Sequence, residues 1–158
     1  MIDPRMVLLL NEVKNTSTFD EFPYDKITKE YFIDDPLPTT DVEKGPCQFG
    51  LLKDYKPKYM LAAGSILKAK MITNCIHYPP MSVMDWHTNS DLEGTRHYYT
   101  YTEGEAIFKY VDENGDVVLD YDDVGWTHRV FKIRKDKPLW HSVWAGSDRY
   151  SFGFMTDD

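Results

Sequence analysis

The sequence has few cysteines and no long apolar run. Cys47 and Cys75 are the only two cysteines among the 158 residues, and no CxxC spacing occurs, so a disulfide framework or a zinc ribbon is not expected. The longest apolar run near the start, Met6 to Leu10, has five residues, which is too short for a signal sequence or a membrane span. We therefore expect reduced thiols, a cytoplasmic location and no membrane partner.

Positive charge is also in the minority. The chain carries 18 Lys and Arg residues against 26 Asp and Glu, a net charge of −8, which disfavours nucleic acid as a partner because nonspecific binding needs a basic surface. The glycine-rich nucleotide-binding motifs and the G-x-S-x-G motif of α/β-hydrolases are missing as well. The length fits a single domain covering residues 1–158.

The first part of the chain is predicted to be irregular. Residues 1–58 are rich in acidic side chains and in prolines that interrupt periodic patterns, which favours loops, short strands and at most one helical turn. The apolar spacing in residues 59–70 predicts one modest helix, weakened by Gly64. We interpret residues 1–70 as an N-terminal cover.

Aromatic residues make up 15% of the chain and concentrate in its second half, where they favour strands. Eight runs of strand length follow one another there at intervals of about ten residues: 71–78, 82–87, 95–102, 106–111, 117–121, 127–133, 139–144 and 149–155. Asn114-Gly115 supplies turn chemistry between the fourth and fifth runs, which should pair. The pattern predicts a mainly β fold, an eight-stranded jelly roll over residues 71–158.

Five histidines occur, and four of them lie in predicted strands. A single histidine in a β domain is usually a hydrogen-bonded structural residue, and we place His128 in that class. His87 and His141 differ because each follows a tryptophan within a polar segment. The acidic cluster Asp120, Asp122 and Asp123 lacks the spacing of a calcium loop, so we predict a solvated turn there.

The order of these parts resembles the iron(II)- and 2-oxoglutarate-dependent oxygenases, whose double-stranded β-helix carries His-X-Asp, a distal His and then Arg-X-Ser. The match covers roughly residues 71–158, with His87, His141, Arg149 and Ser151 at the corresponding positions. The resemblance implies that His87 and His141 bind Fe(II), while Arg149 and Ser151 hold the far carboxylate of 2-oxoglutarate. It also implies a hydroxylase acting on a peptidyl side chain or a small molecule.

The third ligand position departs from the family pattern, because Asn89 stands where the carboxylate is expected. Three completions of the metal shell remain open: Asn89 itself, Asp91 after a tight turn, or water. Water fills this position in the aspartyl/asparaginyl β-hydroxylase branch, whose His-X8-Arg-X-His pattern is similar to His87, Arg96 and Tyr98 here. The resemblance then implies that Tyr98 and Arg96 lie near the cosubstrate. A prolyl hydroxylase-like branch is the other possibility.

Two other classes of function compete with the oxygenase. The first is a non-catalytic jelly roll, either carbohydrate-binding or a virion structural domain, that has lost the metal site and uses its aromatics for binding. The second is a cupin-type metalloenzyme that does not use 2-oxoglutarate, but the His-X-His and following Glu typical of it are missing around His87. The sequence leaves the substrate and the oligomeric state open.

Overall fold

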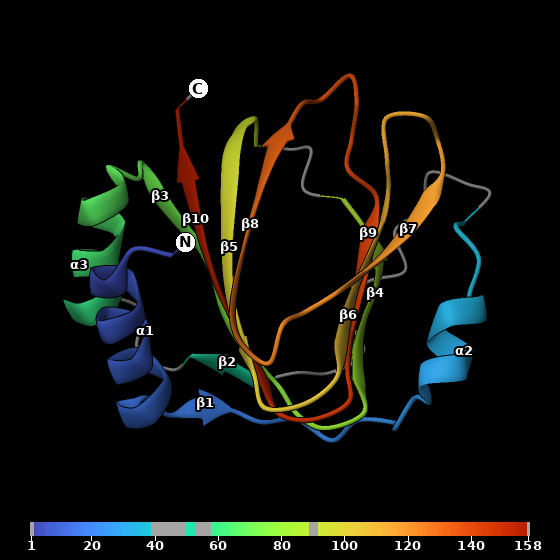
Figure 1. Ribbon diagram of the computed structural model, residues 1–158, viewed down its shortest axis with the longest axis horizontal. Coiled ribbons are helices and arrows are strands. Elements are labelled where there is room, and N and C mark those ends of the chain that lie inside the picture. The colour runs from blue at the N-terminus through green and yellow to red at the C-terminus, as the bar shows by residue number, and fades with distance from the viewer. Residues whose placement is uncertain (1, 39–49, 53–57, 89–91, 158) are drawn as a thin grey trace.

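Two antiparallel β-sheets face each other in the computed structural model, which describes residues 2–38, 50–52, 58–88 and 92–157 (Figure 1). The first sheet has six strands in the order β1-β2-β3-β10-β5-β8, and the second has four in the order β4-β9-β6-β7. The strands of the first sheet are β1 (Phe19–Asp20), β2 (Gly50–Leu52), β3 (Met71–Tyr78), β5 (Gly94–Thr102), β8 (Gly125–Ile133) and β10 (Arg149–Thr156). Those of the second are β4 (Ser82–His87), β6 (Ala106–Val111), β7 (Val117–Tyr121) and β9 (His141–Ala145). The fold is a double-stranded β-helix, as predicted.

The eight predicted strands are confirmed as β3 to β10. The bounds of β3, β4, β6 and β7 are those predicted, and the others differ by one or two residues at an end. Strands β6 and β7 form the expected hairpin, with Val111 opposite Val117. Gly115 supplies the positive φ of +83° that this turn needs. Asn114 is not among the residues with positive φ, so the turn depends on the glycine alone.

Helix α1 (Pro4–Thr16) was not predicted, and the expectation of loops is wrong for this segment. Asp3 caps the helix by accepting a hydrogen bond from the Arg5 amide at 2.9 Å, and Pro4 occupies the first turn, where its missing N–H costs nothing. The buried residues Met6, Leu10 and Val13 recur at helical spacing. The prolines that break periodicity all lie farther along the chain, so they do not affect these residues.

Two helices cover the outer face of the six-stranded sheet. Helix α3 (Lys58–Leu67) confirms the helix predicted over 59–70, and it packs beside α1 on that face (Figure 1). The cluster that joins the helices to the sheet is fully apolar: Met6, Leu10, Val13, Met60, Ala63, Tyr99, Phe152 and Phe154. This core lies outside the space between the sheets, so the inner faces are not needed for it.

A short helix, α2 (Lys29–Asp34), covers the outer face of the four-stranded sheet. Phe32 packs there against Val83, Ile107 and Trp144. The ammonium group of buried Lys109 donates to the backbone carbonyls of Phe32 and Asp35 at the end of α2. A positive charge at a helix C-terminus is favourable, so Lys109 fixes α2 to strand β6.

Candidate functional site

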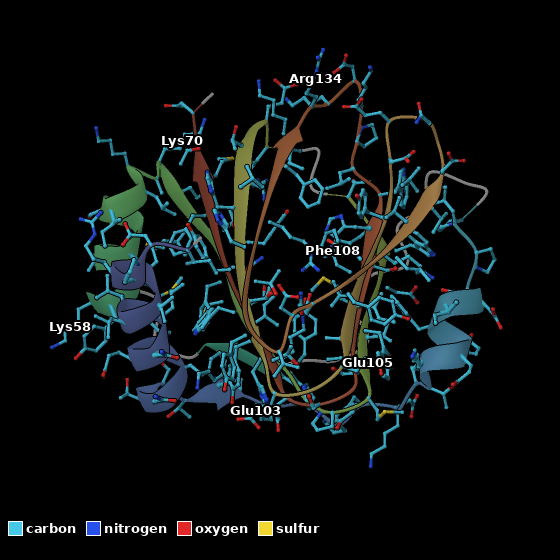
Figure 2. The ribbon with its side chains drawn as sticks, viewed as in Figure 1. Lys58, Lys70, Glu103, Glu105, Phe108 and Arg134 are labelled. Carbon is cyan, nitrogen blue, oxygen red and sulfur yellow. The ribbon has the colours of Figure 1, made fainter. Side chains whose placement is uncertain are left out.

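His87 and His141 lie side by side at one end of the four-stranded sheet. His87 ends β4 and His141 begins β9, and the two are register partners after an irregularity between Met84 and His87. Their ring centroids are 4.1 Å apart. The His141 ring also stacks on Phe108 at 5.4 Å, and Figure 2 shows Phe108 between the two sheets. The two imidazoles predicted as metal ligands therefore meet at the inner face.

The backbone sets the tautomer of both rings. Nδ1 of His87 lies 2.7 Å from the Asp85 carbonyl oxygen, and Nδ1 of His141 lies 2.9 Å from the Leu139 carbonyl oxygen. A carbonyl oxygen only accepts, so each Nδ1 carries the proton and each neutral ring has its lone pair on Nε2. Burial lowers the pKa of His141 to about 3, helped by neighbouring His87. His141 is neutral at pH 7, and this is the usual arrangement of metal-ligating histidines.

The third metal position was predicted to be filled by Asn89, Asp91 or water. Asn89 and Asp91, the two predicted protein candidates, lie outside the described residues. Within residues 2–38, 50–52, 58–88 and 92–157, no group of three or more His, Cys, Asp or Glu side chains is placed to hold a metal ion. The described part of the chain thus offers a two-imidazole set.

Strand β5 brings two more predicted residues to the inner face. Tyr98 is 5% exposed, and its ring centroid lies 6.4 Å from that of His141. Arg96 is buried, donates to the Leu92 carbonyl at 3.2 Å, and its charge contributes to the lowered pKa of His141. Tyr99 and Tyr101 lie on the opposite face, as the alternation of side chains along a strand requires.

Arg149 begins β10 and is 2% exposed. Its guanidinium lies 5.0 Å from the centre of the Tyr78 ring. Two hydroxyl residues share its face: Ser151, which is buried, and Thr100, directly opposite Ser151 on β5. Among the described residues, Oγ1 of Thr100 has no hydrogen-bond partner although it is buried. The inner face therefore carries a polar patch near Arg149 that includes one buried hydroxyl without a partner among the described residues.

The position of Asp122 overturns the predicted solvated turn. Its side chain is 0% exposed, and it accepts from Nε of Arg149 at 2.7 Å and from Nη1 of Arg129 at 2.6 Å. Burial alone would raise the pKa of Asp122, but the two guanidinium groups outweigh it and hold the pKa below its usual value. Asp120 lies in β7 and Asp122 follows the strand on the same face, and Arg129 also donates to Asp120 at 2.8 Å. This alternation of side chains past the end of β7 was the sequence signal, and the interpretation as a turn did not use it.

The remaining histidines lie on other faces. His77 sits between Glu21 and Asp148, with ring nitrogens 2.6 and 2.8 Å from their carboxylates, and it stacks on Tyr150. His97 and His128 meet on the outer face of the six-stranded sheet. Neither group approaches the His87 and His141 rings through any of these contacts.

Neither a protein-family model nor a curated protein matches this chain. Solved structures do. A prolyl hydroxylase from Trichoplax adhaerens, in complex with a peptide fragment of the hypoxia-inducible factor oxygen degradation domain, aligns with a TM-score of 0.55 at 12% identity, covering 98% of this chain and 77% of its own.

Two further structures align less closely. A Pseudomonas putida prolyl-4-hydroxylase has a TM-score of 0.45 at 14% identity, covering 98% of this chain and 100% of its own. A CENP-C domain from Drosophila melanogaster has a TM-score of 0.40 at 9% identity, covering 92% and 81%. At 12% identity, the likeness to the Trichoplax adhaerens structure shows a shared double-stranded β-helix fold and selects no function or branch.

No helix in the described part of the chain combines the length and apolar character needed to cross a membrane.

Proposed function

We propose that this chain is an Fe(II)- and 2-oxoglutarate-dependent hydroxylase whose metal is held by His87 and His141. One observation carries the proposal: both rings donate Nδ1–H to a backbone carbonyl, which puts the lone pair of each ring on Nε2, the tautomer that metal-ligating histidines use. Two imidazoles on one face suit Fe(II), with the remaining positions left for cosubstrate, water and dioxygen. Asn89 or Asp91 would complete the shell, or water would.

The inner face also fits a dicarboxylate. Arg149, Ser151 and the partnerless hydroxyl of Thr100 form a patch that suits a carboxylate, because a guanidinium fork and hydroxyl donors match its two oxygens. Arg96 and Arg129 are buried on the same face, and their charge favours an anion there. Tyr98 is two residues from Thr100 on the same face of β5, and its ring centroid lies 6.4 Å from that of His141, so it would contact the cosubstrate.

Asp122 accepts a hydrogen bond from Nε of Arg149. The terminal amino groups of the guanidinium are therefore the part that would bind a ligand carboxylate. Both oxygens of Asp122 are engaged, one by each arginine. We assign Asp122 the role of positioning Arg149.

When bound, iron(II) and 2-oxoglutarate supply the oxidising chemistry that inserts oxygen into a C–H bond. The chain contributes orientation: the carbonyls of Asp85 and Leu139 fix the two imidazoles, and Asp122 fixes Arg149. Burial keeps His141 neutral, so its lone pair is available at neutral pH.

We propose a peptidyl side chain or a small molecule as the substrate of this enzyme. The Trichoplax adhaerens neighbour was solved with a peptide, and the net charge of −8 favours a neutral or cationic partner over nucleic acid. We also propose a cytoplasmic location, residues 71–158 as the catalytic core and residues 1–70 as its cover.

A non-catalytic jelly roll is the second candidate, and the contact between Asp122 and Arg149 favours it. In that reading the Asp122 carboxylate replaces the cosubstrate carboxylate permanently, and Asn89 marks a lost metal site. Such a domain responds to neither metal nor 2-oxoglutarate.

Thermal unfolding of the metal-stripped chain separates the two candidates. We expect anaerobic Fe(II), or Mn(II) as a redox-stable substitute, to raise the unfolding midpoint, and 2-oxoglutarate to raise it further only when metal is present. His141→Ala should abolish both shifts. Thr100→Val keeps the shape of the side chain, and should keep the metal shift while reducing the 2-oxoglutarate shift. No shift at saturating metal would overturn the oxygenase in favour of the non-catalytic domain.

A further inference from the structure

Strand β7 forms one edge of the four-stranded sheet, where it pairs with β6 alone (Figure 1). Beyond the end of β7, the Asp122 amide donates to the opposite Ala106 carbonyl at 3.0 Å. Hydrogen-bonded pairs alternate along an antiparallel ladder, so the even-numbered residues of β7 bond to β6. The backbone groups of Val117, Leu119 and Tyr121 therefore point to the open side. Among the described residues they have no hydrogen-bond partner there.

The same three residues expose apolar side chains. Val117, Leu119 and Tyr121 are 51%, 37% and 45% exposed. They lie on the outer face, because Tyr121 stands opposite Ile107, whose side chain packs under α2. Edge strands of soluble proteins are usually protected by charges, prolines or bulges, and the edge strand β8 has Lys132 on its outer face. These three positions of β7, which we call the β7 strip, have no such protection.

Acidic side chains lie at both ends of the β7 strip. Residues 112–123 contain Asp and Glu but no Lys or Arg. Asp120 and Asp122 face inward and bind Arg129, whereas Asp116 and Asp123 are exposed. The open edge therefore combines unpaired backbone groups, apolar side chains and negative charge.

A cation already lies on this face. The ammonium group of Lys29, at the start of α2, is 5.5 Å from the centre of the Tyr121 ring and forms an ion pair with Glu105. The face therefore accepts a positive charge over an aromatic ring beside carboxylates.

Charge also decides against a second copy of this chain as the partner. Antiparallel pairing of two β7 edges would bring the acidic turn at residues 112–116 of one copy next to residues 122–123 of the other. Each copy also carries a net charge of −8. Both repulsions disfavour the dimer, whereas a basic partner would gain from the same charges.

We propose that the open edge of β7 binds an extended basic segment of a partner protein, which adds to the sheet as an antiparallel strand. The main chain of the segment pairs with the free backbone groups, and apolar side chains at alternate positions contact the β7 strip. Its Lys or Arg side chains face the carboxylates of residues 112–123. The binding is independent of the proposed oxygenase, because the strip faces outward and needs neither His87 nor His141.

Amide hydrogen exchange of the metal-free full chain, followed by nuclear magnetic resonance, tests the proposal at single residues. The probe is a short synthetic peptide of alternating lysine and valine. In the free chain, the amides of Val118 and Asp120 should exchange slowly and those of the β7 strip rapidly. Saturating peptide should slow exchange in the strip at least tenfold. Unchanged exchange there would overturn the proposal.

Two control peptides separate charge from strand pairing, with binding measured by fluorescence anisotropy. A glutamate-valine peptide should bind at least tenfold more weakly than the lysine-valine peptide. The lysine-valine peptide with N-methylated valines keeps its charge and loses the amide donors that would face β7, so it should also bind at least tenfold more weakly. Equal binding of either control would overturn the proposal.

Variants of the chain locate the site. Leu119→Pro removes an amide donor at the centre of the open edge and leaves the ladder to β6 intact, and Leu119→Lys keeps the backbone but places a repelling charge in the strip. Each should weaken binding of the lysine-valine peptide at least tenfold. Val130→Lys, at a similarly exposed position on β8, is the matched control and should bind as the wild type does. Unchanged binding by Leu119→Lys would overturn the site.

Sedimentation at the concentration used for exchange tests the competing occupant. We expect a monomer. A dimer whose β7 strip amides are protected without peptide would assign the edge to a second copy and overturn the basic partner.

Discussion

The two sheets carry two histidine pairs that are organised differently. His87 and His141 lie at one end of the four-stranded sheet, and His97 and His128 lie on the outer face of the six-stranded sheet. In the inner pair, Nδ1 of His87 and Nδ1 of His141 each donate to a backbone carbonyl. In the outer pair, His97 and His128 bind each other. The comparison teaches that proximity alone does not define a ligand set: the group bound by the second ring nitrogen decides which lone pair is presented.

The charged surroundings differ as well. The inner pair shares its space with Arg96, Arg129 and Arg149, all buried, whereas the outer pair is bordered by Tyr99 and Thr156. An anionic cosubstrate is therefore favoured at the inner site only.

The largest expected effect concerns the charge balance of the inner face. Asp122→Asn should reduce the free energy of unfolding by about 3–5 kcal/mol, because it leaves two buried guanidinium groups without their shared carboxylate. Asp120→Asn is the matched control: its side chain is 48% exposed, and the loss should be about 1 kcal/mol or less. Urea unfolding measures both. Equal losses in the two variants would contradict the assigned role of Asp122.

The second-largest effect is expected for stabilisation by bound metal, which should depend on the inner pair and not on the outer pair. With Mn(II) at about 100 times its dissociation constant, the inner site should stabilise the wild-type chain by about 2.7 kcal/mol. His141→Ala should remove this gain, while His128→Gln should keep it. Urea unfolding with and without Mn(II) measures the difference. A gain that persists in His141→Ala would contradict the assignment of His141 as a metal ligand.

Asp122 should contribute a distinct part of the acid sensitivity, beside that of His128 and His141, whose pKa values are also lowered in the folded chain. The pKa of Asp122 is lowered in the folded chain, so the unfolded state binds more protons below pH 4 and stability falls as the pH decreases through that range. In Asp122→Asn this part of the decrease should be missing. Unfolding midpoints at pH 2.5 to 5 check it, and an unchanged slope in the variant would argue that Asp122 is not ion-paired in solution.

Thr100→Val should change the metal-free protein little. The buried hydroxyl has no partner among the described residues, so replacing it with a methyl group should leave stability unchanged or raise it by up to about 1 kcal/mol. Urea unfolding of the metal-free variant measures this. A loss of 2 kcal/mol or more would show that the hydroxyl is satisfied within the fold and is not reserved for a ligand.

The smallest effect is expected at the outer pair. His128→Gln removes one hydrogen bond at an exposed position, so without metal the stability should change by about 1 kcal/mol or less. The same unfolding measurement checks this value. A larger loss would indicate that the stacking of His128 on Tyr99 stabilises the sheet.

Local patterns in the sequence were sufficient for the strands and for the faces of β5. Alternation puts Tyr98 on one face of the strand and Tyr99 on the other, and the strands and their faces depend on period and turn chemistry, which short windows of sequence contain. The pairing of His87 with His141 came from the resemblance to the oxygenases and not from a local pattern. The ligand role of His87 and His141 stays a prediction.

Features that depend on partners distant in sequence were not predicted. Asp122 is buried because arginines on β8 and β10 reach it, and His97 meets His128 because of the register between β5 and β8. Neither partnership has a local signature. Helix α1 did have one, in Asp3, Pro4 and the spacing of its apolar residues, but the proline-rich segment that follows obscured it.

The contact between Asp122 and the two arginines also has a mechanical consequence. Arg129 and Arg149 belong to one sheet, while the Asp122 amide is bonded to Ala106 at the start of β6 in the other. The ion pairs therefore tie the sheets together at the end where β5 turns into β6 (Figure 1). Separation of the layers is restrained there, so breathing motions should have their largest amplitude at the opposite end, where His87 and His141 lie. Relative motion of the two sheets should therefore be largest next to the two proposed metal ligands.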